Sequence, residues 1–215
     1  MKILIVDDHG IVREGLKSLL QKSLNLEVVG EAEDGLAAVK LARKLSPDVI
    51  IMDVTMPNLN GVEATRLIRE DCPQTKIIAL SMHPEKHIVK EILEAGASAY
   101  VLKSYLFDEL SRALDAVSDN QRYLSPRITD VVIEDYVHQP PGGGDDPSTK
   151  LTSRDRQIVQ MLAEGKTIKQ IALALHISPK TADASRRKIM GKLNVSSIAD
   201  LVKYAVREGI TSLEF

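Results

Sequence analysis

Five residues with carboxylate, hydroxyl or amine side chains follow short apolar runs in the first half of the chain. They are Asp7, Asp8, Asp53, Ser81 and Lys103. Three converging carboxylates repel one another unless a hard cation joins them, and Mg²⁺ prefers oxygen ligands. A carboxylate is also a competent nucleophile, and phosphoryl transfer depends mainly on positioning and on neutralising charge. If the five residues meet, they form a site for a metal ion and a phosphoryl group.

Each of these residues has an ordinary structural explanation when it is considered alone. An Asp at the end of a strand is often a turn former or a helix cap. Lys103 alone would be a solvated surface residue, and Ser81 alone would be structural. All five fall at the ends of predicted strands, so a shared site is the better explanation.

The elements that could bring these residues together alternate over about the first 120 residues. Short apolar runs are separated by stretches in which apolar residues recur at helical spacing. The runs lie at 2–6, 27–30, 48–53, 76–81 and 99–103. Apolar strands separated by helices predict a parallel sheet covered on both faces. Five such units predict an α/β flavodoxin-like fold with a five-stranded parallel sheet of order 2-1-3-4-5.

That fold also predicts where a ligand would bind. Ligands in doubly wound sheets bind beyond the carboxyl ends of the strands, where the strand order reverses. The first and third strands flank this point, and they end at the three acidic residues. The run at 27–30 is more exposed in character, so we expect it at or near an edge of the sheet.

The charge is distributed unevenly along the 215 residues, a length that suggests one or two domains. Residues 1–147 contain 24 acidic and 16 basic residues, whereas residues 148–215 contain 6 acidic and 12 basic residues. This asymmetry indicates an acidic module followed by a basic module that faces a polyanion. Solvated surface charge is the alternative explanation.

The sequence contains no sign of a membrane segment or a disulfide framework. No stretch approaches the ~18 apolar residues that a membrane helix needs. The apolar start MKILIV reaches Asp7 too soon for a signal peptide. Cys72 is the single cysteine, which excludes a disulfide framework and a cysteine-based metal site within the chain. We therefore expect a cytoplasmic protein without membrane contact.

A linker separates the two modules. Ser125 and Pro126 are typical of a helix N-cap and of the first helical position, and they predict a helix over 126–138. The segment QPPGGGDDPST at 139–149 breaks all periodicity, and its PPGGGDDP stretch is interpreted as a flexible hinge. The predicted division is a domain at 1–121, a linker at 122–149 and a second domain at 150–215.

Only helical patterns follow residue 151, so the second domain is predicted to be all-α, with four helices. Polar residues suited to capping precede them. These caps are Thr152, Thr167, Ser178 and either Ser196 or Ser197. The third helix is expected to turn Ala182, Ser185, Ile189 and Leu193 inward. Its opposite face carries Lys180, Asp183, Ala184 and Arg187 at i, i+3, i+4 and i+7.

Four motifs make residues 1–120 resemble a response regulator receiver domain. They are VDDH at 6–9, MDVTMPNLNG at 52–61, ALS at 79–81 and VLK at 101–103. The resemblance implies that Asp53 is the phosphoacceptor. It further implies that Asp8 ligates Mg²⁺ directly, that Asp7 does so through water, and that Asp53 and the Thr55 carbonyl complete the ligand set.

The same resemblance implies roles for the remaining residues of the site. Lys103 and Ser81 would contact the transferred phosphoryl group, and Thr55 and His83 would flank the attacking water. Tyr100 occupies the position of the family's aromatic switch, whose ring rotates inward; an exposed strand aromatic is the alternative. His83 alone would be loop surface. One departure is Ser104, because the family often has proline after this lysine.

Residues 151–210 resemble the LuxR-type helix-turn-helix domain of the NarL/FixJ subgroup, and the match covers the whole segment, LTSRDRQIVQMLAEGKTIKQIALALHISPKTADASRRKIMGKLNVSSIADLVKYAV. The resemblance implies that the third helix enters the major groove of double-stranded DNA. The residues expected to contact DNA are Lys180, Thr181, Asp183, Ala184, Arg186, Arg187 and Lys188. Arg187 can read guanine, Arg186 and Lys188 suit the backbone, and Asp183 could accept from cytosine or reject other sites. A merely solvated charged face is the alternative.

Two inner positions of the third helix depart from that family. Ala182 and Ser185 stand where Val and His are common, and both are smaller. Uncompensated losses of this kind cost on the order of 1–3 kcal/mol, so we expect compensating bulk nearby or a less stable domain. In the fourth helix, Leu201, Val202 and Ala205 could form a pairing face between two copies or the core of one domain.

The two resemblances together imply a bacterial two-component response regulator rather than an enzyme. A sensor histidine kinase or a small phosphodonor would phosphorylate Asp53 and shift an existing equilibrium, so that homodimers bind DNA. One rival is a DNA-binding protein whose receiver only dimerises, without phosphorylation. Another is an Asp-nucleophile phosphatase, but that class needs a second Asp at position 55, which is Thr.

Overall fold

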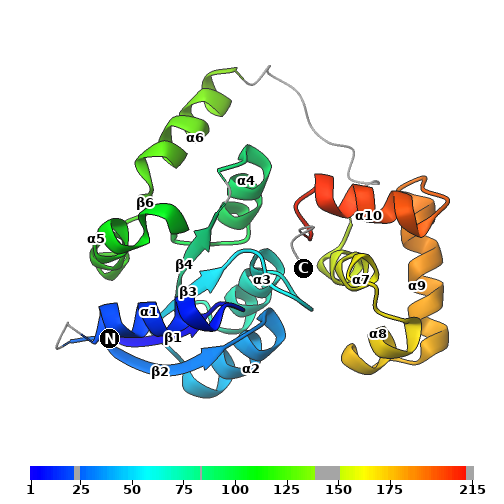
Figure 1. Ribbon diagram of the computed structural model, residues 1–215, viewed down its shortest axis with the longest axis horizontal. Coiled ribbons are helices and arrows are strands. Elements are labelled where there is room, and N and C mark those ends of the chain that lie inside the picture. Colours follow the sequence, from blue (N-terminus) through cyan, green and yellow to red (C-terminus); the bar gives the residue numbers. More distant parts are fainter. Residues whose placement is uncertain (22–24, 83, 139–150, 212–215) are drawn as a thin grey trace. The chain divides into compact units, whose positions relative to one another are not determined.

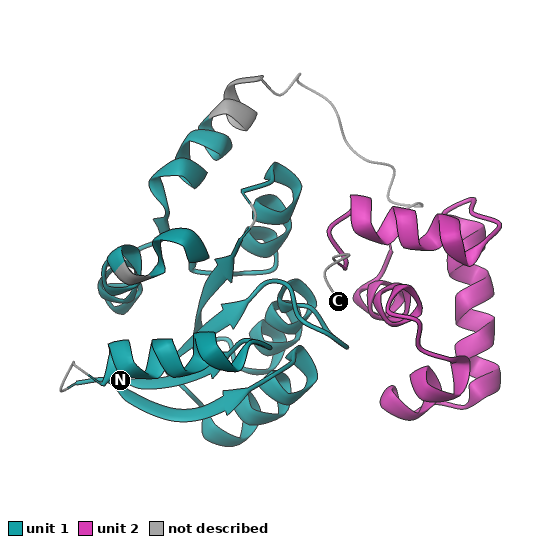
Figure 2. Cartoon of the chain, in the orientation of Figure 1, with its two compact units in different colours: residues 1–139 teal, residues 140–215 magenta. Residues whose placement is uncertain are grey.

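The computed structural model describes residues 1–21, 25–82, 84–138 and 151–211 (Figure 1). The chain divides into two compact units, residues 1–139 and 140–215 (Figure 2). The predicted hinge, PPGGGDDP at 140–147, lies outside the described residues. No helix among the described residues is both long enough and apolar enough to cross a lipid bilayer.

The first unit contains a parallel sheet of order β2-β1-β3-β4-β5-β6. Its strands are β1 (Lys2–Val6), β2 (Glu27–Ala32), β3 (Val49–Asp53), β4 (Lys76–Ser81), β5 (Ala99–Leu102) and β6 (Tyr123–Leu124). The predicted order 2-1-3-4-5 and the edge position of β2 are confirmed. The sheet has six strands rather than the predicted five, because the two-residue β6 is too short to show a periodicity in the sequence.

Helices connect consecutive strands, and the last helix of this unit follows β6. They are α1 (Gly10–Leu20), α2 (Gly35–Leu45), α3 (Gly61–Asp71), α4 (Lys86–Glu94), α5 (Leu106–Ser118) and α6 (Pro126–His138). A short 3-10 helix, η1 (Lys103–Tyr105), lies between β5 and α5. At Ser104, where the sequence departs from the family by lacking proline, the Lys103–Ser104 peptide bond is trans.

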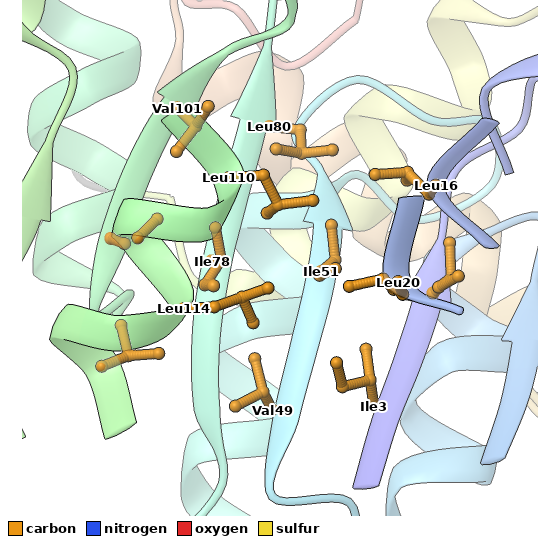
Figure 3. Close-up of a cluster of buried hydrophobic side chains, with 14 of the residues drawn as sticks. Ile3, Leu16, Leu20, Val49, Ile51, Ile78, Leu80, Val101, Leu110 and Leu114 are labelled. Atoms are coloured by element: carbon orange, nitrogen blue, oxygen red, sulfur yellow. The ribbon is translucent and has the colours of Figure 1, made fainter. Parts of the chain in front are cut away.

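Alternate strand residues face opposite sides of the sheet and build a core on each side. On one side, β1 and β3 place Ile3, Val49 and Ile51 against Leu16 of α1 and Leu110 of α5 (Figure 3). The other side contains buried residues from β1 and β3, packed with residues of α2 and α3. Because helices cover both faces, the functional side chains can be reached at the strand ends.

A third buried cluster lies around Tyr100 on β5. It includes Ile88 and Ile92 of α4 and Ile128 of α6, all of them buried. The start of α6 is therefore part of the packed first unit. The sequence predicts this helix as part of the linker, so the packing of its start against the first unit is not expected from the sequence.

The second unit contains α7 (Ser153–Ala163), α8 (Ile168–Ala174), α9 (Pro179–Lys192) and α10 (Ile198–Arg207). The predicted all-α domain of four helices is confirmed. Each helix begins after a hydroxyl side chain that accepts a backbone N–H bond. These capping residues are Thr152, Thr167, Ser178 and Ser197.

The core of the second unit answers the question left open for the fourth helix. Leu201 and Ala205 are fully buried, and α10 packs against α7. These two residues are core residues of a single copy, whereas Val202 is half-buried. A salt bridge of 2.8 Å between Lys192 Nζ and Asp155 Oδ2 also ties the end of α9 to α7.

Candidate functional site

The predicted site residues lie together at one edge of the sheet, at the carboxyl ends of four adjacent strands. They are the three acidic residues together with Ser81 and Lys103. Asp7 and Asp8 follow β1, Asp53 ends β3, Ser81 ends β4 and Lys103 follows β5. Lys103 Nζ lies 2.7 Å from Asp7 Oδ2 and 2.7 Å from Asp53 Oδ2. A lysine 50 residues away in sequence therefore bridges two carboxylates of the proposed site.

The loop after β3 must approach Asp53 closely, and Gly61 makes this possible. Gly61 N–H donates to the Val54 carbonyl at 2.8 Å. A Cβ atom at position 61 would lie only 2.1 Å from the Asp53 carbonyl oxygen. Asn60 then caps α3 by accepting from Glu63 N–H. The loop thus leads the chain into α3 in close contact with the backbone of the candidate acceptor.

Burial and the charge of Lys103 shift the pKa of Asp53 in opposite directions. Its burial raises the pKa of the carboxyl to about 7, Lys103 works against this rise, and Asp7 adds to it. Burial alone would lower the pKa of Lys103, but Asp53 and Asp7 hold it above its usual value. Without a further cation, Asp53 therefore keeps its proton to a higher pH than an ordinary carboxyl group does.

The donor set around Asp53 fits a divalent metal ion. One carboxylate oxygen each from Asp7, Asp8 and Asp53 and one ring nitrogen of His9 all lie within 4.8 Å of one another. Asp7 is fully buried, and Lys103 is the cation that contacts both it and Asp53. Three carboxylates and one ammonium leave a net negative charge at the site. Carboxylate oxygens are ligands that suit Mg²⁺.

His9 was not predicted as part of this cluster. Its Nδ1 lies 2.7 Å from Asp8 Oδ1 and 3.3 Å from Asp7 Oδ1, and its backbone N–H donates to Asp7 Oδ1 at 2.9 Å. The imidazole is largely exposed. The signal for it in the sequence is its position in the VDDH motif, directly after the two acids.

The structure describes two of the three remaining predicted residues of this site, Thr55 and Tyr100. Thr55 N–H donates to Asp53 Oδ1 at 3.2 Å. Tyr100 is fully buried, so the alternative of an exposed strand aromatic is wrong. Burial raises the pKa of its phenol, although a hydrogen bond with Ser81 acts in the opposite direction. His83 lies outside the described residues.

The burial of residues in α9 agrees in part with the predicted inner and outer faces. Ala182 and Ile189 are fully buried, whereas Ser185 and Leu193 are half-buried. The exposed residues among those predicted to contact DNA are Lys180, Thr181, Ala184, Arg187 and Lys188. The outer face is thus basic and consists of side chains that can reach a partner.

Asp183 and Arg186 on the same helix are half-buried, and they are paired. Asp183 Oδ1 lies 2.8 Å from Arg186 Nη2, and Asp183 Oδ2 lies 2.5 Å from Arg187 Nη2. The sequence predicts that Asp183 points a negative charge at the groove, where it could accept from cytosine or reject other sites. In this structure its charge is satisfied by two arginines of its own helix.

Comparison with known proteins agrees with this architecture. Residues 3–115 match the response regulator receiver domain, and residues 149–205 match the luxR family of bacterial regulatory proteins. The chain belongs to the response regulators that join a receiver domain to a LuxR-type DNA-binding domain, and it is a transcriptional regulator of the NarL/FixJ type.

Relatives match over nearly the full length. The chain is 36% identical over 211 residues to the response regulator GacA of Pseudomonas aeruginosa, covering 98% of this chain and 97% of that one. It is 34% identical over 214 residues to the response regulator UvrY of Escherichia coli, covering 100% and 97%. Both alignments include the receiver and the DNA-binding domain.

Solved structures show the same combination of domains. The RcsB response regulator of Salmonella typhimurium matches with a TM-score of 0.59 and 28% identity, covering 96% of this chain and 98% of that one. A structure of an RcsB–DNA complex matches with a TM-score of 0.59 and 26% identity, covering 95% and 96%.

Proposed function

We propose that Asp53 accepts a phosphoryl group and that this modification controls DNA binding by the second unit. The contact of Lys103 Nζ with Asp53, beside Asp7 and Asp8, is the observation that carries the proposal. It puts a nucleophile, a fixed cation and a set of metal ligands within one small site. These are the components that phosphoryl transfer requires.

In the proposed reaction, an Asp53 carboxylate oxygen attacks phosphorus of a phosphohistidine on a sensor kinase, or of a small phosphodonor. An O–P bond forms, and the bond from phosphorus to its leaving group breaks. Lys103 neutralises charge on the transferred group, and Ser81 donates to one of its oxygens. Mg²⁺ held by Asp7, Asp8, Asp53 and the Thr55 carbonyl would supply the remaining charge neutralisation.

The phosphoryl group on Asp53 would then act through Ser81 and Tyr100. Ser81 shifts toward the new anion, and the inward position of the Tyr100 ring is favoured in the phosphorylated state. The buried position of Tyr100 and its hydrogen bond with Ser81 support a connection between these two side chains. Thr55 and His83 would limit access of water to the acyl phosphate and set its lifetime.

We further propose that α9 enters the major groove of double-stranded DNA. Its exposed basic side chains support this role, and the solved RcsB–DNA complex is a precedent in a similar protein. The contact residues would be Lys180, Thr181, Asp183, Ala184, Arg186, Arg187 and Lys188. Two copies would bind together, as in the structure of two RcsB dimers on DNA, within the bacterial cytoplasm where DNA is located.

The proposed division of labour is a phosphoacceptor domain at residues 1–121, a linker at 122–149 and a DNA-binding domain at 150–215. The separate cores of the two units support two domains. In this view the linker transmits the state of the first domain to the second.

Intact-protein mass spectrometry tests the proposal. The chain is incubated with acetyl phosphate in the presence of Mg²⁺ or of EDTA. We expect a mass gain of one phosphoryl group only with Mg²⁺, and no gain for Asp53→Asn. An unmodified wild-type chain would support a receiver that only dimerises, and labelled Asp53→Asn would reject Asp53 as the acceptor.

A further inference from the structure

Ser125 extends the sheet beyond the last residue of β6. Ser125 N–H donates to the Tyr100 carbonyl at 2.9 Å, in line with the parallel pairing of β5 and β6. In a parallel ladder the next bond would run from Leu102 N–H to the Ser125 carbonyl. That carbonyl is already used, because it accepts from Ile128 N–H and Thr129 N–H in the first turn of α6.

The hydroxyl of Ser125 replaces the missing carbonyl. Leu102 N–H donates to Ser125 Oγ at 3.1 Å, and the hydroxyl in turn donates to Glu109 Oε2 on α5. The sequence predicted Ser125 as a helix cap, whereas its side chain is bonded to β5 and α5. We call these two hydrogen bonds, from Leu102 N–H to Ser125 and from Ser125 to Glu109, the Ser125 latch.

The latch is buried. Ser125 has 1% of its surface exposed and Glu109 has 8%. Loss of the hydroxyl would leave a buried N–H donor and a buried carboxylate without these partners, which is far more costly than losing a hydrogen bond at the surface. The latch therefore holds the end of β5, the first turn of α5 and the start of α6 in one arrangement.

Leu102 is directly followed by Lys103, the residue that contacts Asp53. Lys103 opens the short helix η1, so the direction of its side chain depends on where the backbone leaves β5. On the far side of the latch, Ile128 of α6 lies in the same buried cluster as Tyr100. The start of α6 is thus linked to the site in two ways: through Ser125 to the residue before Lys103, and through Ile128 to the cluster that contains Tyr100.

We propose that Ser125 and Glu109 are positioning residues that set Lys103 for phosphoryl transfer, and that they couple the start of α6 to the state of Asp53. This inference depends on the proposed phosphorylation of Asp53. Equilibrium coupling free energies are reciprocal. If the latch stabilises the phosphorylated state relative to the unphosphorylated state, phosphorylation also tightens the attachment of α6, the last helix of the first unit in the sequence.

The test compares full-length variants that remove or keep the latch. Ser125→Ala removes the hydroxyl, Glu109→Ala removes its acceptor, and Glu109→Gln keeps an oxygen that can accept. Arg127→Ala is the matched control, because Arg127 is an exposed residue in the same turn of α6. Three quantities are measured: the rate of phosphorylation by acetyl phosphate at saturating Mg²⁺, the Kd for Mg²⁺, and hydrogen exchange at the Leu102 amide.

We expect Ser125→Ala and Glu109→Ala to slow phosphorylation by roughly 5- to 30-fold, as for a loss of one buried interaction. The Kd for Mg²⁺ should stay unchanged, because the metal ligands are on other strands. Hydrogen exchange at the Leu102 amide should be faster in both variants. In the wild type, beryllofluoride, which mimics the phosphoryl group, should make this exchange slower. Glu109→Gln and Arg127→Ala should behave like the wild type.

Two results would overturn the inference. One is a wild-type phosphorylation rate in Ser125→Ala despite a fast-exchanging Leu102 amide, which would separate the latch from Lys103. The other is a parallel loss of Mg²⁺ binding and thermal stability, which would make the latch merely structural. A wild-type chain that takes up no phosphoryl group would instead reject the proposed function itself.

Discussion

At the scale of single residues, Asp53 combines two opposing requirements. It must be an anion to attack phosphorus, yet burial and the nearby Asp7 favour its neutral form. Lys103 offsets part of this cost through its contact with Asp53. A bound dication would offset more, so metal binding and the ionisation of Asp53 are coupled.

Stability without metal should fall with rising pH because of Asp53. Its pKa is about 7 in the folded chain and near 3.8 when unfolded. Between these values the folded state binds more protons than the unfolded state, so stability is lost as the pH rises through that window. Asp53→Asn should remove this loss and be more stable than the wild type at pH 8 by about 1 kcal/mol or more, but not at low pH.

Urea denaturation at pH 4 and pH 8 in EDTA measures this difference. Mg²⁺ should then stabilise the wild type at pH 8 and leave Asp53→Asn unchanged, since a ligand stabilises only the state that binds it. Equal pH profiles for the two proteins would show that Asp53 ionises freely in the folded chain.

Asp183 restrains two arginines on the face proposed to contact DNA. Ion pairs that solvent reaches contribute only ~0.2–1 kcal/mol to stability, so Asp183→Asn should leave folding nearly unchanged. It should free Arg186 and Arg187 for phosphates, raise affinity for non-specific duplex DNA and steepen the salt slope by about 1. Asp119→Asn makes the same charge change in the first unit and is the control.

Fluorescence anisotropy with a random-sequence duplex at several salt concentrations measures the affinity and slope. If Asp183→Asn and Asp119→Asn bind this duplex equally, the two ion pairs of Asp183 have no influence on DNA binding.

At the scale of elements, the turn between β3 and α3 shows how a local motif serves the site. Gly61 lies so close to the Asp53 carbonyl that any side chain would have to move the backbone that holds the acceptor. Asn58 in the same loop adopts a positive φ of 65°, and its Nδ2 donates to Asp34 Oδ2 at 3.0 Å. The loop therefore fixes the acceptor through its backbone.

Gly61→Ala should destabilise the chain by about 1–3 kcal/mol, as overpacking of a tight site does. It should also slow phosphorylation, because the shifted atoms belong to Asp53 and Val54. Gly191→Ala is the matched control: it lies within α9 with open space around it, and alanine there should be neutral or stabilising by up to ~1 kcal/mol. Thermal melting and acetyl phosphate labelling of both variants check this, and a fully stable, fully active Gly61→Ala would contradict it.

The sequence predicted the elements well because each pattern reflects contacts among close neighbours. Buried strands appear in the sequence as apolar runs. Thr152 and Thr167 predict the starts of the helices that they cap. The strand β6 was missed because two residues carry no periodicity. The sequence predicts Ser125 as a helix cap, whereas its hydroxyl bonds to β5 and α5. A serine suits both roles, so the residue type alone does not distinguish them.

At the scale of the whole molecule, the two units differ in charge as well as in fold. The excess of basic over acidic residues lies in residues 148–215, and α9 exposes Lys180, Arg187 and Lys188. A polyanion should therefore be held mainly by the second unit, through release of counterions. The acidic first unit should contribute little attraction.

DNA binding by the full chain should accordingly weaken steeply as salt rises. Arg187→Ala should reduce the affinity for a duplex selected from a random pool by about 1–3 kcal/mol and relax the preference at one base position. Selection followed by anisotropy titration measures both effects. A flat salt profile would contradict an electrostatic interface, and an unchanged selected site would remove Arg187 from it.

The sequence by itself determined the two domain types, the strand order, and the residue types available at each strand end and helix face. Only the tertiary structure decided which side chains meet: Lys103 with Asp7 and Asp53, His9 with the acidic cluster, and Asp183 with its two arginines. Periodicity records whether a residue faces the core. It does not record the distance between atoms far apart in the chain, which depends on how all the elements pack together.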